Sequence, residues 1–374
     1  MIEEDKEKMK NAEVVDVLLK YKDLDTGDKP IVIVGPAGNN KTHLRVYAYG
    51  GLIGEIATNS RFDCKIANSM SVINKESKEK AYSYGKYLLQ YFVNGQGYKF
   101  CPSNTLFGDD KYGNKCQTVE LAGKQYEGLY HYFEEVVTSS QPKKEILCDE
   151  TYLDLIVSAA KTRFVHKTKE GTEYPQERSI QTKIAKLNMQ KPCLDGNMIV
   201  VDMESTIPIK KNETIKNAEI DFVLFDGYSF GLVEFKYRGE SMKKNSANSL
   251  KVHYDDFESI INTKKDEDKW KTIGELLGRV NYLLEYKLID EGWKDKINEL
   301  KEKCKEGGTF DSKLLWCGFY FVESGNKNIE NEIELQIKDK IEANPNIVVK
   351  YQYSTENNLD IVMKDDIRRV WNKN

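Results

Sequence analysis

The stretch AEIDFVLFDGYSFGLVEFKYRGE, residues 218–240, contains two apolar segments separated by a short turn sequence. Both segments are rich in aromatic and β-branched residues, and Gly227 lies between them. This pattern is typical of an antiparallel β-hairpin. We therefore expect strands over 218–226 and 228–237, and a β-sheet in the second half of the chain.

Two charged residues interrupt the second of these strands. Side chains two positions apart point to the same face of a strand, so Glu234 and Lys236 share one face. Val233 and Phe235 point to the other face, into an expected core. A carboxylate among apolar neighbours loses several kcal/mol to desolvation unless a cation or a lysine compensates its charge. The hairpin brings Asp221 beside this pair, and two carboxylates with a backbone carbonyl form a site that suits Mg²⁺.

Such a set of groups fits the hydrolysis of a phosphodiester bond. That reaction needs a metal that polarises the phosphate, an acidified water and a positive group near the attacking or leaving oxygen. The stretch resembles the core of the PD-(D/E)XK nucleases, with Asp221 as the motif aspartate and Glu234-Phe235-Lys236 as the ExK triplet, although Ile220 replaces the proline. The resemblance implies that Asp221 and Glu234 bind Mg²⁺ or Mn²⁺, that Phe235 offers its carbonyl, and that Lys236 orients or activates the water.

The order of elements from residue 174 onward is also similar to that family. It reads helix, three strands, helix, inserted helices, strand, helix and strand, over 174–188, 197–206, 218–226, 228–237, 246–262, 271–286, 293–305, 313–322, 328–342 and 346–354. We expect an α/β protein with a restriction-endonuclease-like αβββαβ core in a domain over 161–374, and a helical insertion at about 265–306.

Three further polar residues are candidates for the same site. Many family members carry an acidic residue on the first core helix, and the resemblance assigns this role to Glu177. Gln181, one helical turn later, either contacts phosphate or is solvated. Glu204 either lines the same cleft or marks the end of its strand.

Residues 1–160 resemble no family that we can name and read as an α+β region. We expect helices over 1–23, 78–94, 124–138 and 150–161, and strands over 30–34 and 44–56. This region is expected to recognise the substrate, a partner or an activating ligand. The sequence is compatible with a homodimer or with a protein partner bound through this region.

The segment IVIVGPAGNNKTHL, residues 31–44, invites comparison with a nucleotide-binding P-loop. Gly35, Lys41 and Thr42 fit GxxxxGK[ST], but Asn40 stands where a glycine is required. The residues that follow read as a strand, whereas a P-loop opens a helix. We therefore interpret the segment as a glycine-rich hairpin loop, with a nucleotide-using enzyme as the alternative.

Composition narrows the class of protein. The 7 cysteines and 4 histidines are dispersed, which argues against a zinc site. The net charge is −4, but 161–191 carries eight Lys or Arg against three Glu, and 236–251 carries five against one. These stretches are either solvated faces or phosphate contacts.

The chain starts with a charged segment and has no apolar run long enough to span a membrane, so we expect a cytoplasmic protein.

We therefore predict a Mg²⁺-dependent nuclease acting on nucleic acid, with DNA expected rather than RNA and no membrane partner. The alternative is a non-catalytic nucleic-acid-binding or interaction protein on the same fold. A role in defence fits such a nuclease by association only.

Overall fold

The computed structural model describes residues 15–16, 18–23, 27–35, 43–57, 100–102, 118–121, 124–127, 157, 160–161, 165–167, 173–174, 176–211, 214–238, 249–262, 265–323, 329–363 and 366–371. The helix expected over 78–94 lies outside these residues. The chain divides into two compact units, Met1–Ile33 with Thr42–Thr182, and Val34–Lys41 with Lys183–Asn374. None of the helices in the described part is long and apolar enough to cross a membrane.

The first unit contains a four-stranded sheet in the order β1-β2-β3-β4, formed by β1 (Ile31–Val34), β2 (His43–Ala48), β3 (Gly51–Ala57) and β4 (Phe100–Pro102). β2 pairs antiparallel with β3, and β3 pairs antiparallel with β4. The single strand expected over 44–56 is instead a hairpin. Tyr49 and Gly50 turn the chain with φ of 52° and 89°, which a continuous strand does not contain. Gly50 also has no room for a side chain, because a Cβ there would lie 2.4 Å from the backbone of Arg178.

The expectation of a helix over 124–138 is wrong at its start. Residues Lys124–Glu127 form β6, which pairs antiparallel with β5 (Thr118–Leu121), and the remainder lies outside the described residues. The backbone N–H and C=O groups of β5 and β6 hydrogen-bond to each other. Helical propensity, which depends on one segment alone, does not predict this pairing. A second two-stranded sheet joins β7 (His166–Lys167) to β8 (Glu173–Tyr174).

The second unit is built on a mixed five-stranded sheet in the order β13-β12-β11-β10-β9. The expected hairpin is present: β10 (Thr214–Phe225) and β11 (Phe230–Tyr237) are antiparallel and close at the pair Phe225–Phe230. β9 (Ile199–Lys211) pairs antiparallel with β10, whereas β12 (Leu315–Val322) and β13 (Val349–Ser354) are parallel to their neighbours. The protein is therefore of the α/β class.

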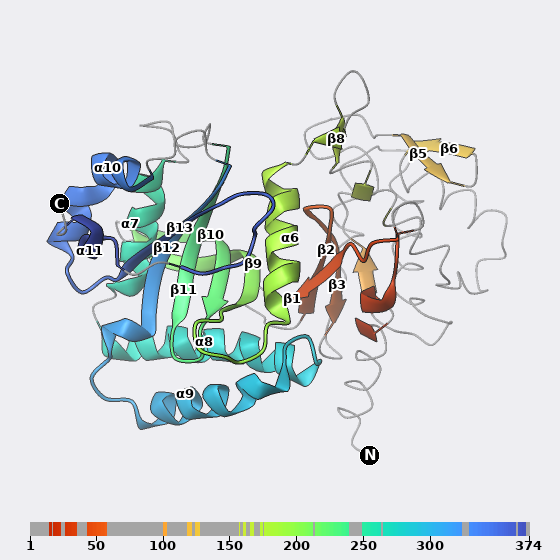
Figure 1. The fold of residues 1–374 in the computed structure, drawn as a ribbon. Coiled ribbons are helices and arrows are strands. Elements are labelled where there is room, and N and C mark those ends of the chain that lie inside the picture. The colour runs from red at the N-terminus through yellow and green to blue at the C-terminus, as the bar shows by residue number, and fades with distance from the viewer. Residues whose placement is uncertain are drawn as a thin grey trace, which may run out of the picture. The chain divides into compact units, whose positions relative to one another are not determined.

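Helices flank this sheet. Figure 1 shows α7 (Leu250–Ile261), α10 (Ile329–Ala343) and α11 (Arg368–Trp371) on one side of the strands and α6 (Glu177–Met189) on the other. Between α7 and β12 the chain forms α8 (Asp266–Glu285) and α9 (Lys294–Glu306), joined through a 3₁₀ turn at Glu291–Trp293. The connections to β12 and β13 therefore pass through helices, as parallel strands require.

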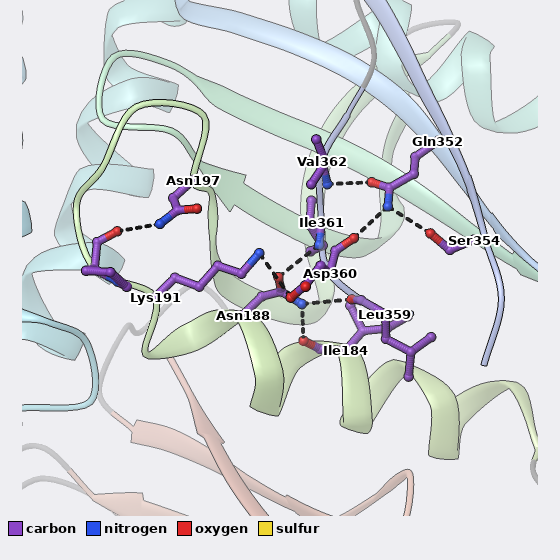
Figure 2. A network of polar contacts seen from close by, with 11 residues as sticks. Ile184, Asn188, Lys191, Asn197, Gln352, Ser354, Leu359, Asp360, Ile361 and Val362 are labelled. Atoms are coloured by element: carbon purple, nitrogen blue, oxygen red, sulfur yellow. Dashed lines mark hydrogen bonds and ion pairs between the residues drawn. The ribbon is translucent and has the colours of Figure 1, made fainter. Parts of the chain in front are cut away.

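The segment that follows β13 is held by two buried amides (Figure 2). Asn188 of α6 donates to the carbonyl of Leu359 at 3.0 Å and accepts from the N–H of Ile361 at 2.9 Å. Gln352 of β13 donates to the carbonyl of Asp360 at 2.6 Å and accepts from the N–H of Val362 at 2.7 Å. These bonds fasten residues 359–362 to the end of α6 and to the edge strand of the sheet.

Candidate nuclease site

β11 is buried along its whole length, so both of its faces are covered. On one face, the Phe235 ring lies 5.8 Å from those of Phe222 and Tyr320, both at edge-on angles. The other face carries Glu234 and Lys236, and α7 covers it. The side chains of Glu234 and Lys236 are each only 4% exposed. The charges that the sequence placed in a strand are thus taken out of water, and they need partners within the protein.

Glu234 and Lys236 are each other's partners. The ammonium Nζ of Lys236 donates to Oε1 of Glu234 at 2.5 Å. Burial raises the pKa of the Glu234 carboxyl, but the contact with His253 and the charge of Lys236 together outweigh it and leave this pKa below its ordinary value. Glu234 is therefore ionised at neutral pH although it is buried.

His253 of α7 is a third member of the site, and sequence reasoning missed it. Its Nε2 atom lies 3.0 Å from Oε1 of Glu234. The two atoms are close without forming a hydrogen bond, and within the described residues this buried nitrogen has no other partner. The position could have been found from the helical repeat, because His253 lies beside the buried stripe that contains Leu250, Tyr254 and Phe257.

Asp221 joins the site from β10. Its Oδ2 accepts a hydrogen bond from the backbone N–H of Phe235 at 2.8 Å. The antiparallel pairing of β10 and β11 runs from Phe225–Phe230 to Phe222–Val233, and Asp221 and Glu234 are the next residues along the two strands. In a regular antiparallel ladder, a backbone carbonyl would accept the hydrogen bond from this N–H; here the Asp221 side chain accepts it. The Asp221 carboxylate therefore lies beside the Glu234-Phe235-Lys236 triplet.

Glu204 extends the row of acids to a third strand. It lies within β9, between the pairs Ser205–Ile220 and Met203–Phe222, and hence opposite Asp221. The interpretation that Glu204 marks a strand end is therefore wrong, since β9 continues to Lys211. Its φ of 46° is in the left-handed region, which is unfavourable for a non-glycine residue in a strand.

Comparison with known proteins does not assign this chain to a family. No protein-family model, curated protein or solved structure matches this chain. The relation to the PD-(D/E)XK nucleases therefore remains a resemblance, carried by Asp221, by the Glu234–Lys236 pair and by the order of the elements around them.

The candidates on α6 belong partly to the other unit. Glu177 is the first residue of α6 and is half-buried, and Gln181 is 3% exposed. The interpretation of Gln181 as a solvated side chain is therefore wrong, because it lies on the buried side of the helix with Ile180 and Ile184. Both Glu177 and Gln181 fall in the first unit, whereas Asp221, Glu234 and Lys236 fall in the second.

The basic stretch over 236–251 is only partly described. Lys236 is buried in the pair with Glu234, and the exposed Arg238 is paired with Glu356 at 3.0 Å. Lys251 is exposed on the first turn of α7. Residues 239–248 lie outside the described part.

Other kinds of site find less support in the described residues. No group of three or more His, Cys, Asp or Glu side chains among them is arranged to hold a metal ion. Cys193, Cys304 and Cys317 are free thiols. Where a P-loop needs a helix, the chain continues into strand β2, and the loop over 36–42 lies outside the described residues. The strand predicted after this loop is therefore confirmed as β2.

Proposed function

We propose that this chain is a metal-dependent nuclease of the PD-(D/E)XK type, which hydrolyses phosphodiester bonds in nucleic acid, with DNA as the expected substrate. One observation carries the proposal. A buried, ionised glutamate and a lysine lie two residues apart in β11, and Asp221 on the neighbouring strand is hydrogen-bonded to the residue between them. Burial of these charges is costly for a protein that only needs a stable sheet.

The arrangement of elements supports the same proposal. α6, β9, β10, β11, α7 and β12 follow one another in the order of the αβββαβ core, and α8 and α9 form an insertion between α7 and β12. The three strands β9, β10 and β11 are consecutive and antiparallel, and β12 joins them in parallel. The proposed core is therefore restriction-endonuclease-like.

The residues fit Mg²⁺ or Mn²⁺. Asp221 and Glu234 offer carboxylate oxygens and Phe235 offers its carbonyl, and such hard oxygen donors suit these cations. A metal ligand must be deprotonated, and the lowered pKa of Glu234 meets that condition. Mg²⁺ keeps several waters and takes few protein ligands, so a site without three acidic or histidine side chains is compatible with it. A bound metal supplies a polarised phosphate and an acidified water.

The chain's own residues supply the remaining functions. Lys236 places a positive charge beside Glu234, where it orients a water or stabilises charge that develops on a phosphate oxygen. The bond between Asp221 and Phe235 fixes the aspartate relative to the triplet. Rigid positioning of this kind on strands is what a reacting centre requires.

Nucleic acid would be held mainly through phosphates. Exposed cations near the site, such as Arg238 and Lys251, are suited to such contacts. We therefore expect binding to weaken steeply as salt concentration rises. The first unit would recognise the substrate, a partner or a ligand.

A non-catalytic nucleic-acid-binding protein is the alternative. The presence of aspartate, glutamate and lysine together favours the enzyme, because a protein that only binds does not need all three. Lys236→Ala separates the two functions: cleavage should vanish while nucleic-acid binding largely survives. A variant that loses neither would remove Lys236 from the reaction.

The decisive experiment measures cleavage of plasmid, linear and single-stranded DNA and of RNA with Mg²⁺, Mn²⁺ or EDTA. Wild type is compared with Glu234→Gln, which keeps the shape of the side chain and removes its charge. Glu285→Gln is the matched control, because Glu285 is an exposed glutamate on α8 whose carboxylate accepts a hydrogen bond from Asn281 at 2.9 Å. Metal-dependent cutting that is lost only in Glu234→Gln supports the nuclease. Equal inactivity of wild type and both variants on every substrate contradicts it.

A further inference from the structure

A single carboxylate oxygen in the site has two neighbouring nitrogens. Oε1 of Glu234 accepts the 2.5 Å bond from Lys236, while Nε2 of His253 stands 3.0 Å away. Nε2 is buried and makes no hydrogen bond within the described residues. A buried polar nitrogen left without a bond costs free energy, and such an exception asks for an explanation.

The proposed reaction gives Lys236 a second task. Its ammonium has three N–H donors, so a water or phosphate oxygen that it binds shares the positive charge with Glu234. The buried glutamate is then less well compensated, which is unfavourable. A group that can take over the same oxygen removes this penalty. His253 is the one histidine described beside Glu234, and it already lies within reach.

We propose that His253 is a positioning residue that hydrogen-bonds Glu234 while Lys236 binds a water or phosphate oxygen, and so keeps the glutamate in place as a metal ligand. This inference rests on the proposed nuclease function. In it, His253 touches neither substrate nor metal, and it acts through Glu234 alone. Hydrogen-bonded partners of metal-binding side chains orient their ligands, and their loss weakens metal binding.

The packing of α7 supports this role, because it fixes where His253 can be. Phe257 packs against Phe319 of β12 with ring centroids 6.0 Å apart. Asp255 forms an ion pair with Lys340 of α10, and the Tyr254 hydroxyl donates to the Lys340 carbonyl at 3.4 Å. The helix is thus held at the sheet and at α10, and the His253 side chain, 17% exposed, is held over β11.

Because His253 and Lys236 share Glu234, the role of His253 can be measured without metal. In wild type both Lys236 and His253 face Glu234, so Lys236 still compensates the glutamate after His253→Ala. In a Lys236→Met background, His253 is the remaining partner of Glu234. There His253→Ala should shift the unfolding equilibrium constant about tenfold more than it does in wild type, a coupling typical of side chains that share one partner. Additive effects of the two substitutions overturn the inference.

Metal binding provides the second arm and keeps the test informative if the Lys236→Met protein does not fold. Mn²⁺ affinity is measured by calorimetry for wild type, His253→Ala, His253→Gln and the control Tyr254→Phe, which alters α7 on the side of α10. We expect His253→Ala to weaken Mn²⁺ binding by about ten- to hundredfold. His253→Gln, whose amide can also donate to Glu234, should recover most of it, and Tyr254→Phe should leave it unchanged.

The outcomes separate the two proposals. Wild type that binds Mn²⁺ and His253→Ala that binds it equally well overturn the role of His253 and leave the nuclease standing. Wild type that binds no Mn²⁺ contradicts the nuclease and the metal-ligand role of Glu234 with it. An equal loss of affinity in His253→Ala and Tyr254→Phe assigns His253 to the packing of α7 only.

Discussion

The carboxylate of Asp221 accepts a hydrogen bond from the backbone N–H of Phe235 at 2.8 Å, so one side chain links β10 to β11 at the point where β11 carries Glu234 and Lys236. Asp221 consequently has two roles that can be separated. As an acceptor it satisfies a strand N–H, and as an anion it would help to hold a metal. The first role needs an oxygen, and the second needs a negative charge.

Two substitutions of Asp221 distinguish these roles. Asp221→Asn keeps an oxygen that can accept from Phe235, so we expect nearly wild-type stability with loss of Mn²⁺ binding. Asp221→Ala leaves the N–H of Phe235 unsatisfied and should also lower the free energy of unfolding by about 1–3 kcal/mol. Urea denaturation and calorimetric titration with Mn²⁺ measure the two effects. Equal destabilisation by both variants would show that the bond to Phe235 contributes nothing specific.

Glu234 gives a pH dependence whose sign follows from its lowered pKa. Because the folded-state pKa lies below the unfolded value of about 4.3, the stabilisation is complete above that value and is lost as the pH falls through the folded-state pKa. We expect the free energy of unfolding, measured in EDTA, to fall more steeply with decreasing pH in wild type than in Glu234→Gln. Parallel curves for the two proteins would mean that Glu234 has no depressed pKa.

The sequence predicted the central part of this site for a local reason. The strand positions of Glu234 and Lys236 follow from a two-residue repeat, and Gly227 brings Asp221 opposite them. Each of these relationships depends on residues within one hairpin. The helices and strands of the second unit were also found to within a few residues, since their apolar periodicity is strong.

What the sequence did not predict depends on contacts between distant segments. The helical repeat places His253 beside the buried stripe of α7, but only the packing of α7 on β11 brings it to Glu234. Leu187 follows Ile180 and Ile184 at helical spacing, which predicts a buried side chain, but it is 55% exposed. Residues Lys124–Glu127 form a strand because β5 is available to pair with it. Tertiary pairing overrides local preference in these cases.

A buried ion pair joins α8 to the sheet. Arg279 of α8 donates to Asp202 of β9 and to the Ser205 hydroxyl, both at 2.5 Å, and Asp202 is completely buried. Arg279→Met leaves the Asp202 charge without its arginine, and we expect a loss of about 3–5 kcal/mol in the free energy of unfolding. Adding Asp202→Asn should recover a large part of that loss, because no charge then remains buried. Denaturant titration of the two variants checks this, and an equally unstable double variant would contradict it.

Asn188 holds the segment after β13 to α6 (Figure 2). Asn188→Ala removes its bonds to Leu359 and Ile361 and leaves buried backbone groups unsatisfied. We expect it to cost about 2–3 kcal/mol and to speed amide hydrogen exchange over 359–363. Gln190→Ala, at an exposed amide one residue beyond the helix, is the matched control and should change neither quantity. Unchanged exchange in Asn188→Ala would show that Gln352 alone holds the segment.

The backbone of Glu204 should reverse the usual ranking of alanine and glycine in a strand. A φ of 46° costs an alanine about 1–2 kcal/mol and a glycine almost nothing. Glu204→Gly should therefore be more stable than Glu204→Ala by about 1 kcal/mol, a comparison in which the loss of the carboxylate cancels. At the exposed Thr206 of the same strand, glycine should instead be less stable than alanine by about 0.5–1 kcal/mol. Thermal unfolding of the four variants measures both differences. If alanine is preferred at both positions, the left-handed backbone at Glu204 does not persist in solution, and the carboxylate row across β9, β10 and β11 loses its first member.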